Sequence, residues 1–375
     1  MNQGPPVRTD AAVPLVDLVA QQADVNADVM ERLTEVFRQA GFIGGPAVAE
    51  FATTYAEFLD ARRCVGVTDG TDALKLALRA SGVGAGGEVI PPANTFIATA
   101  EAASRIGAVP VPADVDPEYL LIDNAAVAAA VTPGTRAIVP LFSRTAFVEQ
   151  LIPVASACGA VIIEDAGQSQ GATRFGRSAG TLGLAAGSSF YPGKNLGAAG
   201  DAGAVVTDDG GVAARVRTLS SHASSQKYVH DVVGSNSRLD AVQAVVLRAK
   251  LAKLETWNLP RRAAAERCSH LLADVPGWAP PREAPGNADV RHLYVVRAPD
   301  RDAVLAVLQS AGIQARVHYP VPVHLSGAYA GPEVREGSFP VAERAAGRIL
   351  PLPLYPHITE AQQERVVRAA STAMS

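Results

Sequence analysis

Residues 161–169 read Val-Ile-Ile-Glu-Asp-Ala-Gly-Gln-Ser, a short apolar run, rich in β-branched residues, that ends in two acids. Such a run predicts a buried strand with Asp165 at its carboxyl end. Open α/β sheets bind their ligands at that end of their strands. We therefore expect an α/β fold with a mostly parallel sheet and a ligand beside Asp165.

A second stretch, residues 188–197, reads Ser-Ser-Phe-Tyr-Pro-Gly-Lys-Asn-Leu-Gly. Its glycines allow close backbone approach and positive φ angles, which often mark a ligand. Alone, the stretch also fits a phosphate-binding loop in which Lys194 is a point charge. An acid at a strand end and a lysine on a later loop are, however, what pyridoxal 5′-phosphate (PLP) needs. The amine condenses with its aldehyde, and Asp165 would pair with its pyridine nitrogen.

The rest of the chain alternates between predicted strands and helices, which indicates βα units. A Pro/Gly-rich span at 276–286 precedes a smaller α+β region. We predict two domains, an N-terminal arm with a large PLP-binding domain (1–254) and a small C-terminal domain (255–375). The sequence predicts strands at 64–67, 88–90, 109–111, 137–141, 161–164, 204–207, 291–297 and 315–318, a long helix at 238–254 and a terminal helix at 360–372.

Composition excludes several classes of protein. The formal net charge of −4 argues against nucleic acid as a partner, because phosphate binding needs clustered Lys and Arg. The sequence has no run of about 18 apolar residues, so we expect no membrane span, and residues 1–10 do not resemble a secretory signal. Three cysteines without metal-ligand spacing predict no metal site and a reducing, cytoplasmic location.

Together, the motifs at 164–168 and 189–197 resemble the DegT/DnrJ/EryC1/StrS family of PLP-dependent sugar aminotransferases, and the resemblance covers nearly the whole chain. It implies an aspartate-aminotransferase-like (fold type I) large domain. It also implies PLP as cofactor, with the pyridoxamine 5′-phosphate form between two half-reactions. Lys194 and Asp165 would be the catalytic residues, L-glutamate the amino donor and a nucleotide-linked keto sugar the acceptor.

The resemblance also implies roles for further residues. Ordinary alternatives stay open for three of them: capping of a helix by Thr71, Asp72 or Asn236, a core position for Phe96, and a surface amide for Gln168. Asn236 would reach the PLP phosphate of the neighbouring subunit, which predicts a homodimer with shared active sites. His324 is either a substrate contact or a structural residue. The implied PLP contacts are Gly70, Thr71, Phe96, Gln168, Ser189 and Asn236, and the implied substrate contacts are Tyr191, Lys227, His318 and Tyr319.

One segment departs from the family pattern. Residues 140–148 read Pro-Leu-Phe-Ser-Arg-Thr-Ala-Phe-Val, where relatives carry a run like His-Leu-Tyr-Gly-Gln-Pro-Ala-Asp-Met. The departure puts the family role of this loop in doubt and leaves open whether Arg144 and Phe147 belong to the pocket. Because Lys194 and Asp165 are present, we expect activity to be retained.

The runs at 227–230, 234–240 and 255–258, with Arg261 and Arg262, resemble the enzymes that aminate C3 of dTDP-3-keto-6-deoxyhexoses. Such enzymes make antibiotic-type or cell-surface amino sugars. C4 amination of a dTDP-4-keto-6-deoxyhexose and amination of a cyclitol ketone are the alternatives. A related sugar dehydratase would carry histidine in place of Lys194. A PLP- or sugar-binding regulator is the alternative that is not an enzyme, although no basic patch supports binding to DNA.

Overall fold

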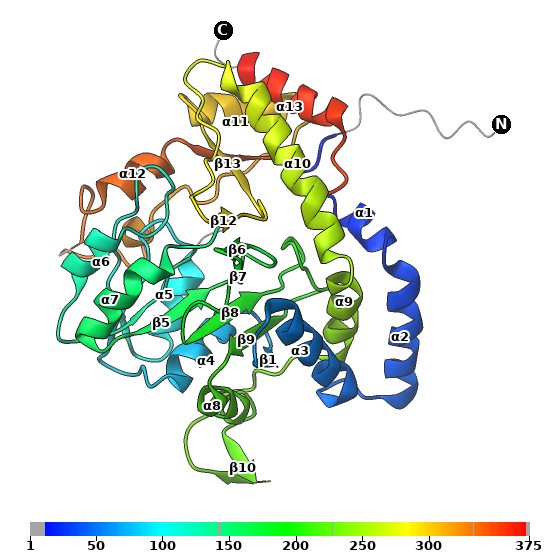
Figure 1. Ribbon diagram of the computed structural model, residues 1–375, viewed down its shortest axis with the longest axis vertical. Coiled ribbons are helices and arrows are strands. Elements are labelled where there is room, and N and C mark those ends of the chain that lie inside the picture. The colour runs from blue at the N-terminus through cyan, green and yellow to red at the C-terminus, as the bar shows by residue number, and fades with distance from the viewer. Residues whose placement is uncertain (1–11, 142–143, 227, 333, 373–375) are drawn as a thin grey trace.

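The computed structural model describes residues 12–141, 144–226, 228–332 and 334–372 (Figure 1). Its centre is a seven-stranded sheet in the order β1-β9-β8-β5-β4-β2-β3. Strand β9 runs antiparallel to β1 and β8, and the other neighbouring pairs are parallel. The predicted α/β fold with a mostly parallel sheet is confirmed. The strands are β1 (Arg63–Val67), β2 (Glu88–Ile90), β3 (Val109–Pro110), β4 (Thr135–Ile138), β5 (Val161–Asp165), β8 (Ala185–Ser189) and β9 (Gly203–Thr207).

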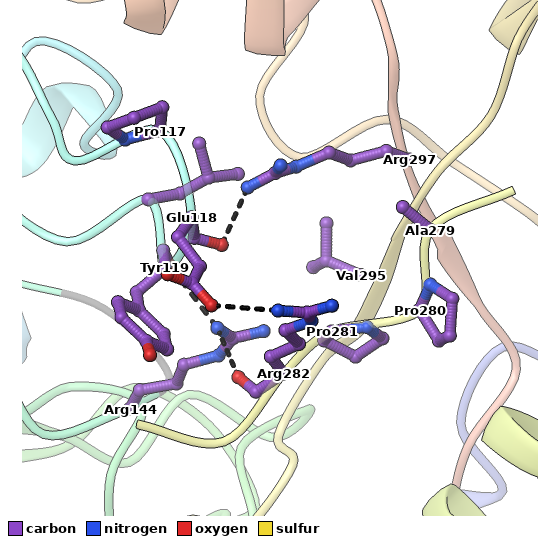
Figure 2. A pocket seen from close by; sticks show the side chains of 11 residues that line it. Pro117, Glu118, Tyr119, Arg144, Ala279, Pro280, Pro281, Arg282, Val295 and Arg297 are labelled. Carbon is purple, nitrogen blue, oxygen red and sulfur yellow. Dashed lines mark hydrogen bonds and ion pairs between the residues drawn. The ribbon is translucent and has the colours of Figure 1, made fainter. Parts of the chain in front are cut away.

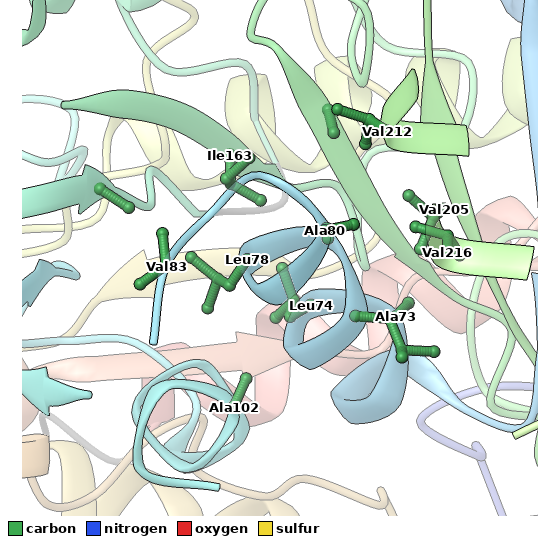
Figure 3. Close-up of a cluster of buried hydrophobic side chains, with 14 of the residues drawn as sticks. Ala73, Leu74, Leu78, Ala80, Val83, Ala102, Ile163, Val205, Val212 and Val216 are labelled. Carbon is green, nitrogen blue, oxygen red and sulfur yellow. The ribbon is translucent and has the colours of Figure 1, made fainter. Parts of the chain in front are cut away.

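Both faces of the sheet are buried, and successive residues of a strand face opposite sides. In β1, Val65 and Val67 pack into one hydrophobic cluster and Cys64 into another. Figure 3 shows the first cluster, in which Leu74 and Leu78 of α4 lie among side chains from neighbouring elements. Helices α4 (Gly70–Ala80), α5 (Ile97–Ser104) and α8 (Gly210–Ser220) contribute to this cluster, whereas α3 (Gly45–Leu59), α6 (Asn124–Ala130), α7 (Val148–Cys158) and α9 (Ala241–Leu251) contribute to the clusters on the other face.

Strand β8 lies in the middle of the sheet, although the sequence did not predict it. It reads Ala-Ala-Gly-Ser-Ser, and these small residues have little intrinsic preference for a strand. A Cβ atom at Gly187 would lie 2.9 Å from atoms of Leu74, because α4 packs directly on this strand. The close packing of α4, rather than the strand propensity of these residues, therefore explains why β8 consists of small residues.

Two predicted elements differ from the structure. The helix expected over 238–254 is split into α9 and α10 (Leu254–Ala273), and α10 continues through Pro260. Residues 238–240 lie outside the helix instead, because Asp240 pairs with Ile43 through an isolated bridge and α9 begins only at Ala241. The strand expected at 315–318 is absent from the described structure. A bridge between Val13 and Ile313 holds the preceding residues.

A second hydrophobic core lies at one end of the molecule (Figure 1). It is built largely from residues beyond 264, with Val13 joining from the N-terminal region. The domain boundary at 254/255 falls where α10 begins, and it stays a prediction. The elements of this core are α10, β13 (Tyr294–Arg297), α11 (Arg301–Ser310), β14 (Ile349–Leu352) and α13 (Glu360–Thr372).

The remaining elements are short or peripheral: α1 (Leu18–Ala23), α2 (Asn26–Gln39), β6 (Thr173–Arg174), β7 (Arg177–Ser178), β10 (Ser224–Gln226), β11 (Val229–His230), β12 (Asn287–Ala288), η1 (Val323–Leu325) and α12 (Pro340–Ala346).

Among the described residues, no helix is long and apolar enough to cross a membrane.

The fold predicts that truncating a buried and an exposed apolar side chain to alanine will lower the stability of the protein by different amounts. Leu78 is fully buried in the cluster of Figure 3, so Leu78→Ala should lower the free energy of unfolding by about 3 kcal/mol through lost burial and a residual cavity. Ile152 on α7 is 46% exposed, so Ile152→Ala should cost less than about 0.5 kcal/mol. Urea unfolding followed by circular dichroism measures both. Equal losses would contradict this packing.

Candidate active site

A cavity of about 630 Å³ lies at the carboxyl ends of β5 and β8, beside the N-terminus of α4. It brings together most of the residues that the sequence singled out. Asn236 does not line it, and Lys227 lies outside the described residues. The predicted residues that do line it are Gly70, Thr71, Phe96, Asp165, Gln168, Ser189, Tyr191, Lys194, His318 and Tyr319.

Asp165 ends strand β5 at the edge of this cavity. Its Oδ2 accepts a hydrogen bond from the Thr99 hydroxyl (2.7 Å), and its Oδ1 accepts one from the Gly167 N–H (3.2 Å). Burial raises the pKa of Asp165, although these two donors and the nearby Lys194 charge lower it in part. The neighbouring Glu164 has a different task, since its carboxylate accepts three backbone N–H groups of residues 180–183 and stabilises that loop.

Lys194 lies on a turn that leaves the end of β8, and its N–H donates to the Tyr191 carbonyl (2.8 Å). Burial lowers the pKa of Lys194 to about 8, because the charged ammonium loses hydration, while the Asp165 carboxylate raises it in part. A lysine with this pKa is partly neutral near pH 7, as a reacting amine must be.

The N-terminus of α4 forms one wall of the cavity. Asp69 caps the helix by accepting the Asp72 N–H (2.8 Å), so capping by Thr71 or Asp72 is wrong. The N–H groups of Gly70 and Thr71 have no partner within the helix, and the helix dipole favours an anion there. The backbone approaches Ser189 so closely that a Cβ at Gly70 would lie 2.5 Å from the Ser189 Cβ. This wall therefore suits a phosphate.

Two aromatic rings, those of Phe96 and Tyr319, also line the cavity. Phe96 precedes α5 and is 47% exposed, so a core position for it is wrong. Its ring lies 5.2 Å from that of Tyr319, at an interplanar angle of 30°. Gln168 is buried and its Nε2 donates to the Tyr319 hydroxyl (2.9 Å), so a surface position for this amide is also wrong. These rings offer a flat apolar surface to a planar ring.

The structure adds residues to the site that sequence reasoning missed. Thr99 lies one helical turn after Phe96, and this spacing could have placed it on the cavity side. Arg316 lies two residues before His318, but the sequence analysis did not predict that it lines the cavity. His292 and Gln314 line the cavity with no local sequence signal, because long-range packing brings them there.

Of the described residues of the departing segment (140–141 and 144–148), only Leu141 lines this cavity. Arg144 lines a separate cavity of about 390 Å³, shown in Figure 2. There its guanidinium donates to the carbonyls of Tyr119 (3.2 Å) and Arg282 (2.9 Å). Phe147 packs edge-on against Tyr119. Neither Arg144 nor Phe147 belongs to the lining of the larger cavity.

His324 and Asn236 also lie away from the larger cavity. His324 is fully buried, and its Nε2 is 2.9 Å from the Glu343 carboxylate, which favours a structural role. Asn236 is exposed, and the Arg238 Nε donates to its Oδ1 (3.1 Å). Helix α9 begins only after Asp240, so Asn236 is not its cap, contrary to the simplest interpretation.

The residues of the cavity fit PLP by their chemistry. Lys194 offers an amine for its aldehyde and Asp165 a carboxylate for its ring nitrogen. The N-terminus of α4, with Ser189 against it, offers N–H and hydroxyl groups for its phosphate. The Phe96 ring offers a surface for stacking.

Comparison with known proteins gives extensive similarity. The model of the DegT/DnrJ/EryC1/StrS aminotransferase family matches residues 23–371. The chain is 44% identical over 357 residues to the "Erythromycin biosynthesis sensory transduction protein EryC1" of Saccharopolyspora erythraea, covering 95% of this chain and 98% of that protein. It is 43% identical over 359 residues to the "dTDP-3-amino-3,4,6-trideoxy-alpha-D-glucose transaminase" of Streptomyces venezuelae, covering 95% of each.

A solved structure agrees with these sequence matches. The X-ray crystal structure of S. venezuelae DesV superposes with a TM-score of 0.94 at 43% identity, covering 96% of this chain and 98% of that one. This match confirms the expected aspartate-aminotransferase-like fold. The chain therefore belongs to the DegT/DnrJ/EryC1/StrS family of PLP-dependent aminotransferases.

Proposed function

We propose that this aminotransferase moves an amino group from L-glutamate to C3 of a dTDP-linked 3-keto-6-deoxyhexose. The observation that carries the proposal is that Lys194 and Asp165 line one cavity, which the N-terminus of α4 also borders. The 43% identity to the S. venezuelae dTDP-3-amino sugar transaminase supports the nucleotide and the carbon atom. C4 amination of a dTDP-4-keto-6-deoxyhexose is the main alternative.

Asp165 and Lys194 have separate tasks in this proposal. When bound, PLP supplies an electron sink that stabilises negative charge on the carbon that loses its proton. Asp165, held by Thr99 and Gly167, would keep a negative charge beside the ring nitrogen. Lys194 would hold and release the transferred proton, because its pKa of about 8 lies close to the working pH.

Cations at the mouth of the cavity suit the anionic part of the substrate. Arg105 and Arg316 both line the cavity and are exposed to solvent. Guanidinium groups bind diphosphate oxygens well. We therefore assign Arg105 and Arg316, together with His318, Tyr319 and Tyr191, to binding of the nucleotide sugar. The substrate role of Lys227 stays a prediction from the sequence.

We also propose a homodimer in which Asn236 completes the site of the partner subunit. Asn236 is exposed and does not line the cavity of its own chain. The neighbouring hairpin of β10 and β11 lies apart from the main body of the fold in Figure 1. Val232 and Val233, which follow this hairpin, are exposed apolar residues that a partner could cover.

A small substrate panel tests the proposed function. The PLP-loaded protein is incubated with L-glutamate and one keto substrate at a time: a dTDP-3-keto-6-deoxyhexose, a dTDP-4-keto-6-deoxyhexose or a cyclitol ketone. Mass spectrometry should detect the amino product chiefly from the 3-keto sugar. A preference for the 4-keto sugar or for the cyclitol would reject the C3 assignment and leave the transaminase activity intact. No product and no 2-oxoglutarate would reject the proposed activity.

The lowered pKa of Lys194 predicts how the cofactor-free protein takes up PLP. Only the neutral amine attacks the aldehyde, so the uptake rate should rise about tenfold per pH unit below pH 7 and level off above about pH 8. Stopped-flow absorbance at several pH values measures this rate, and Lys194→Ala should show no lysine-dependent absorbance. An uptake rate that levels off only near pH 10 would mean that burial does not lower the pKa.

Subunit complementation tests whether Asn236 acts across a dimer. Lys194→Ala and Asn236→Ala each damage every site of their own homodimers. In a mixed dimer, one site regains both residues if Asn236 acts in the partner subunit, so random mixing should restore about a quarter of wild-type activity. Mixing Lys194→Ala with Asp165→Asn is the matched control, because those residues share one chain's cavity. Absence of recovery in both mixtures would contradict a shared site.

A further inference from the structure

Three buried side-chain amides lie just outside the cavity, close to the segments that carry its central residues. They belong to Gln170, Asn195 and Asn258, each at most 3% exposed, and none of the three lines the cavity. Asn195 directly follows Lys194, and Gln170 comes shortly after Asp165. Asn258 lies on α10, in a distant part of the sequence. Burying amide groups costs free energy unless hydrogen bonds offset the loss of water, so the bonds that these amides make show what they stabilise.

Gln170 joins the segment after β5 to the end of β8. Its Nε2 donates to the Ala166 carbonyl (3.2 Å) and to the Ser189 carbonyl (3.0 Å). Ala166 directly follows Asp165, and Ser189 packs against the N-terminus of α4, the wall that suits a phosphate. One side chain therefore connects the acid of the site to that wall.

Asn258 joins the Lys194 turn to the same segment. Its Nδ2 donates to the Gln170 carbonyl (3.1 Å), and its Oδ1 accepts from the Asn195 Nδ2 (2.9 Å). The packing here is tight, because a Cβ atom at Gly171 would lie 2.7 Å from the Asn258 Nδ2. The residue after Lys194 is therefore connected to the Gln170 segment through a single side chain.

The shape of PLP makes the spacing of these segments important. Its aldehyde and its ring nitrogen lie at opposite ends of one rigid ring, so the Lys194 amine and the Asp165 carboxylate need a fixed separation. Lys194 lies on a turn beyond β8, where the hydrogen bonds of the sheet have ended. Bonds from buried side chains can hold such a turn in place of a sheet.

We propose that Gln170, Asn195 and Asn258 are positioning residues for the reaction, which set the separation of Lys194 and Asp165 from outside the cavity. Gln170 connects the acid to the phosphate wall, so it determines how tightly PLP binds before any covalent bond forms. Asn258 holds the Lys194 turn through Asn195, so it determines how fast the amine reacts with the bound aldehyde. The inference rests on the proposed roles of Lys194 and Asp165.

The first test follows the reaction of the cofactor-free protein with PLP by stopped-flow absorbance. The Lys194-dependent signal at saturating PLP gives the rate of condensation, in which a carbon–nitrogen double bond forms and water leaves. Asn258→Leu keeps the branched shape but removes both hydrogen bonds, and it should lower this rate by about tenfold or more, because a misplaced amine reacts slowly. Asn258→Ala serves if that variant does not fold. A folded variant that condenses at the wild-type rate would overturn the proposal.

The second test removes the covalent step. In the Lys194→Ala background, equilibrium titration measures the affinity for PLP that is bound without a covalent bond. Gln170→Met should weaken this affinity about tenfold, because Ser189 is no longer held to the segment after Asp165. Asn258→Leu should leave the same affinity nearly unchanged. If both variants lower affinity and condensation rate to the same extent, the amides only stabilise the fold and the proposal is wrong.

Gln363→Met is the matched control for both tests. Gln363 is equally buried (3% exposed), but it lies on α13 beside Cys268 of the second core and does not line the cavity. The control should keep the wild-type condensation rate, and in the Lys194→Ala background the wild-type affinity, even where thermal unfolding shows a comparable loss of stability. If it slows condensation as much as Asn258→Leu does, general destabilisation explains the effect and the proposal fails.

These outcomes are separate from those of the proposed function. Neither measurement uses a nucleotide sugar or glutamate, so a wrong choice of sugar carbon leaves both unaffected. Conversely, a protein that aminates the 3-keto sugar, but whose Asn258→Leu variant condenses with PLP at the wild-type rate, would keep its function and lose this inference.

Discussion

Helix α4 lies almost in backbone contact with strands β8 and β9, and the site depends on this close approach. A Cβ atom at Gly203 would lie 2.2 Å from the Asp69 carbonyl oxygen, and one at Gly70 would lie 2.5 Å from the Ser189 Cβ. At Gly187 an added Cβ would meet Leu74 at 2.9 Å. Three glycines therefore let the positive end of α4 lie beside the strand that leads to Lys194. Any larger residue at these three positions would push α4 away from β8 and β9.

Burial then shifts the pKa values of the two central groups towards each other. The pKa of Asp165 rises and that of Lys194 falls to about 8, in both cases chiefly because the charged form loses hydration. Their mutual attraction acts in the opposite sense on each group. Buried groups with shifted pKa values in one cavity are typical of functional sites. Beside them, buried hydrogen bonds join Asn258 to Asn195 and Asn195 to His292, which also lines the cavity.

Arg144 belongs to the segment that was expected to depart from the family pattern, and it joins separate parts of the fold. Arg144 is buried, with its Nε 3.7 Å from the Asp289 carboxylate, and burial lowers the pKa of Arg144 to about 10. Together with the carbonyls of Tyr119 and Arg282, this ion pair connects the sheet edge to the segment that includes residues 279–289 (Figure 2). Arg144 thus forms a contact between parts of the fold and does not line the cavity of Asp165 and Lys194.

The sequence by itself determined the features that depend on neighbours along the chain. These include the apolar run that ends at Asp165, the turn that carries Lys194, and the strand-to-helix turn at Gly70. Motifs of this kind predicted the family and ten residues of the cavity lining. The tertiary structure alone decided the rest: that the small residues of β8 form a central strand, that Thr99 bonds Asp165, and that Asn236 lies outside its own chain's cavity. It also decided that His292 lines the cavity of Lys194, because contacts between segments far apart in the sequence bring it there and no local pattern encodes them.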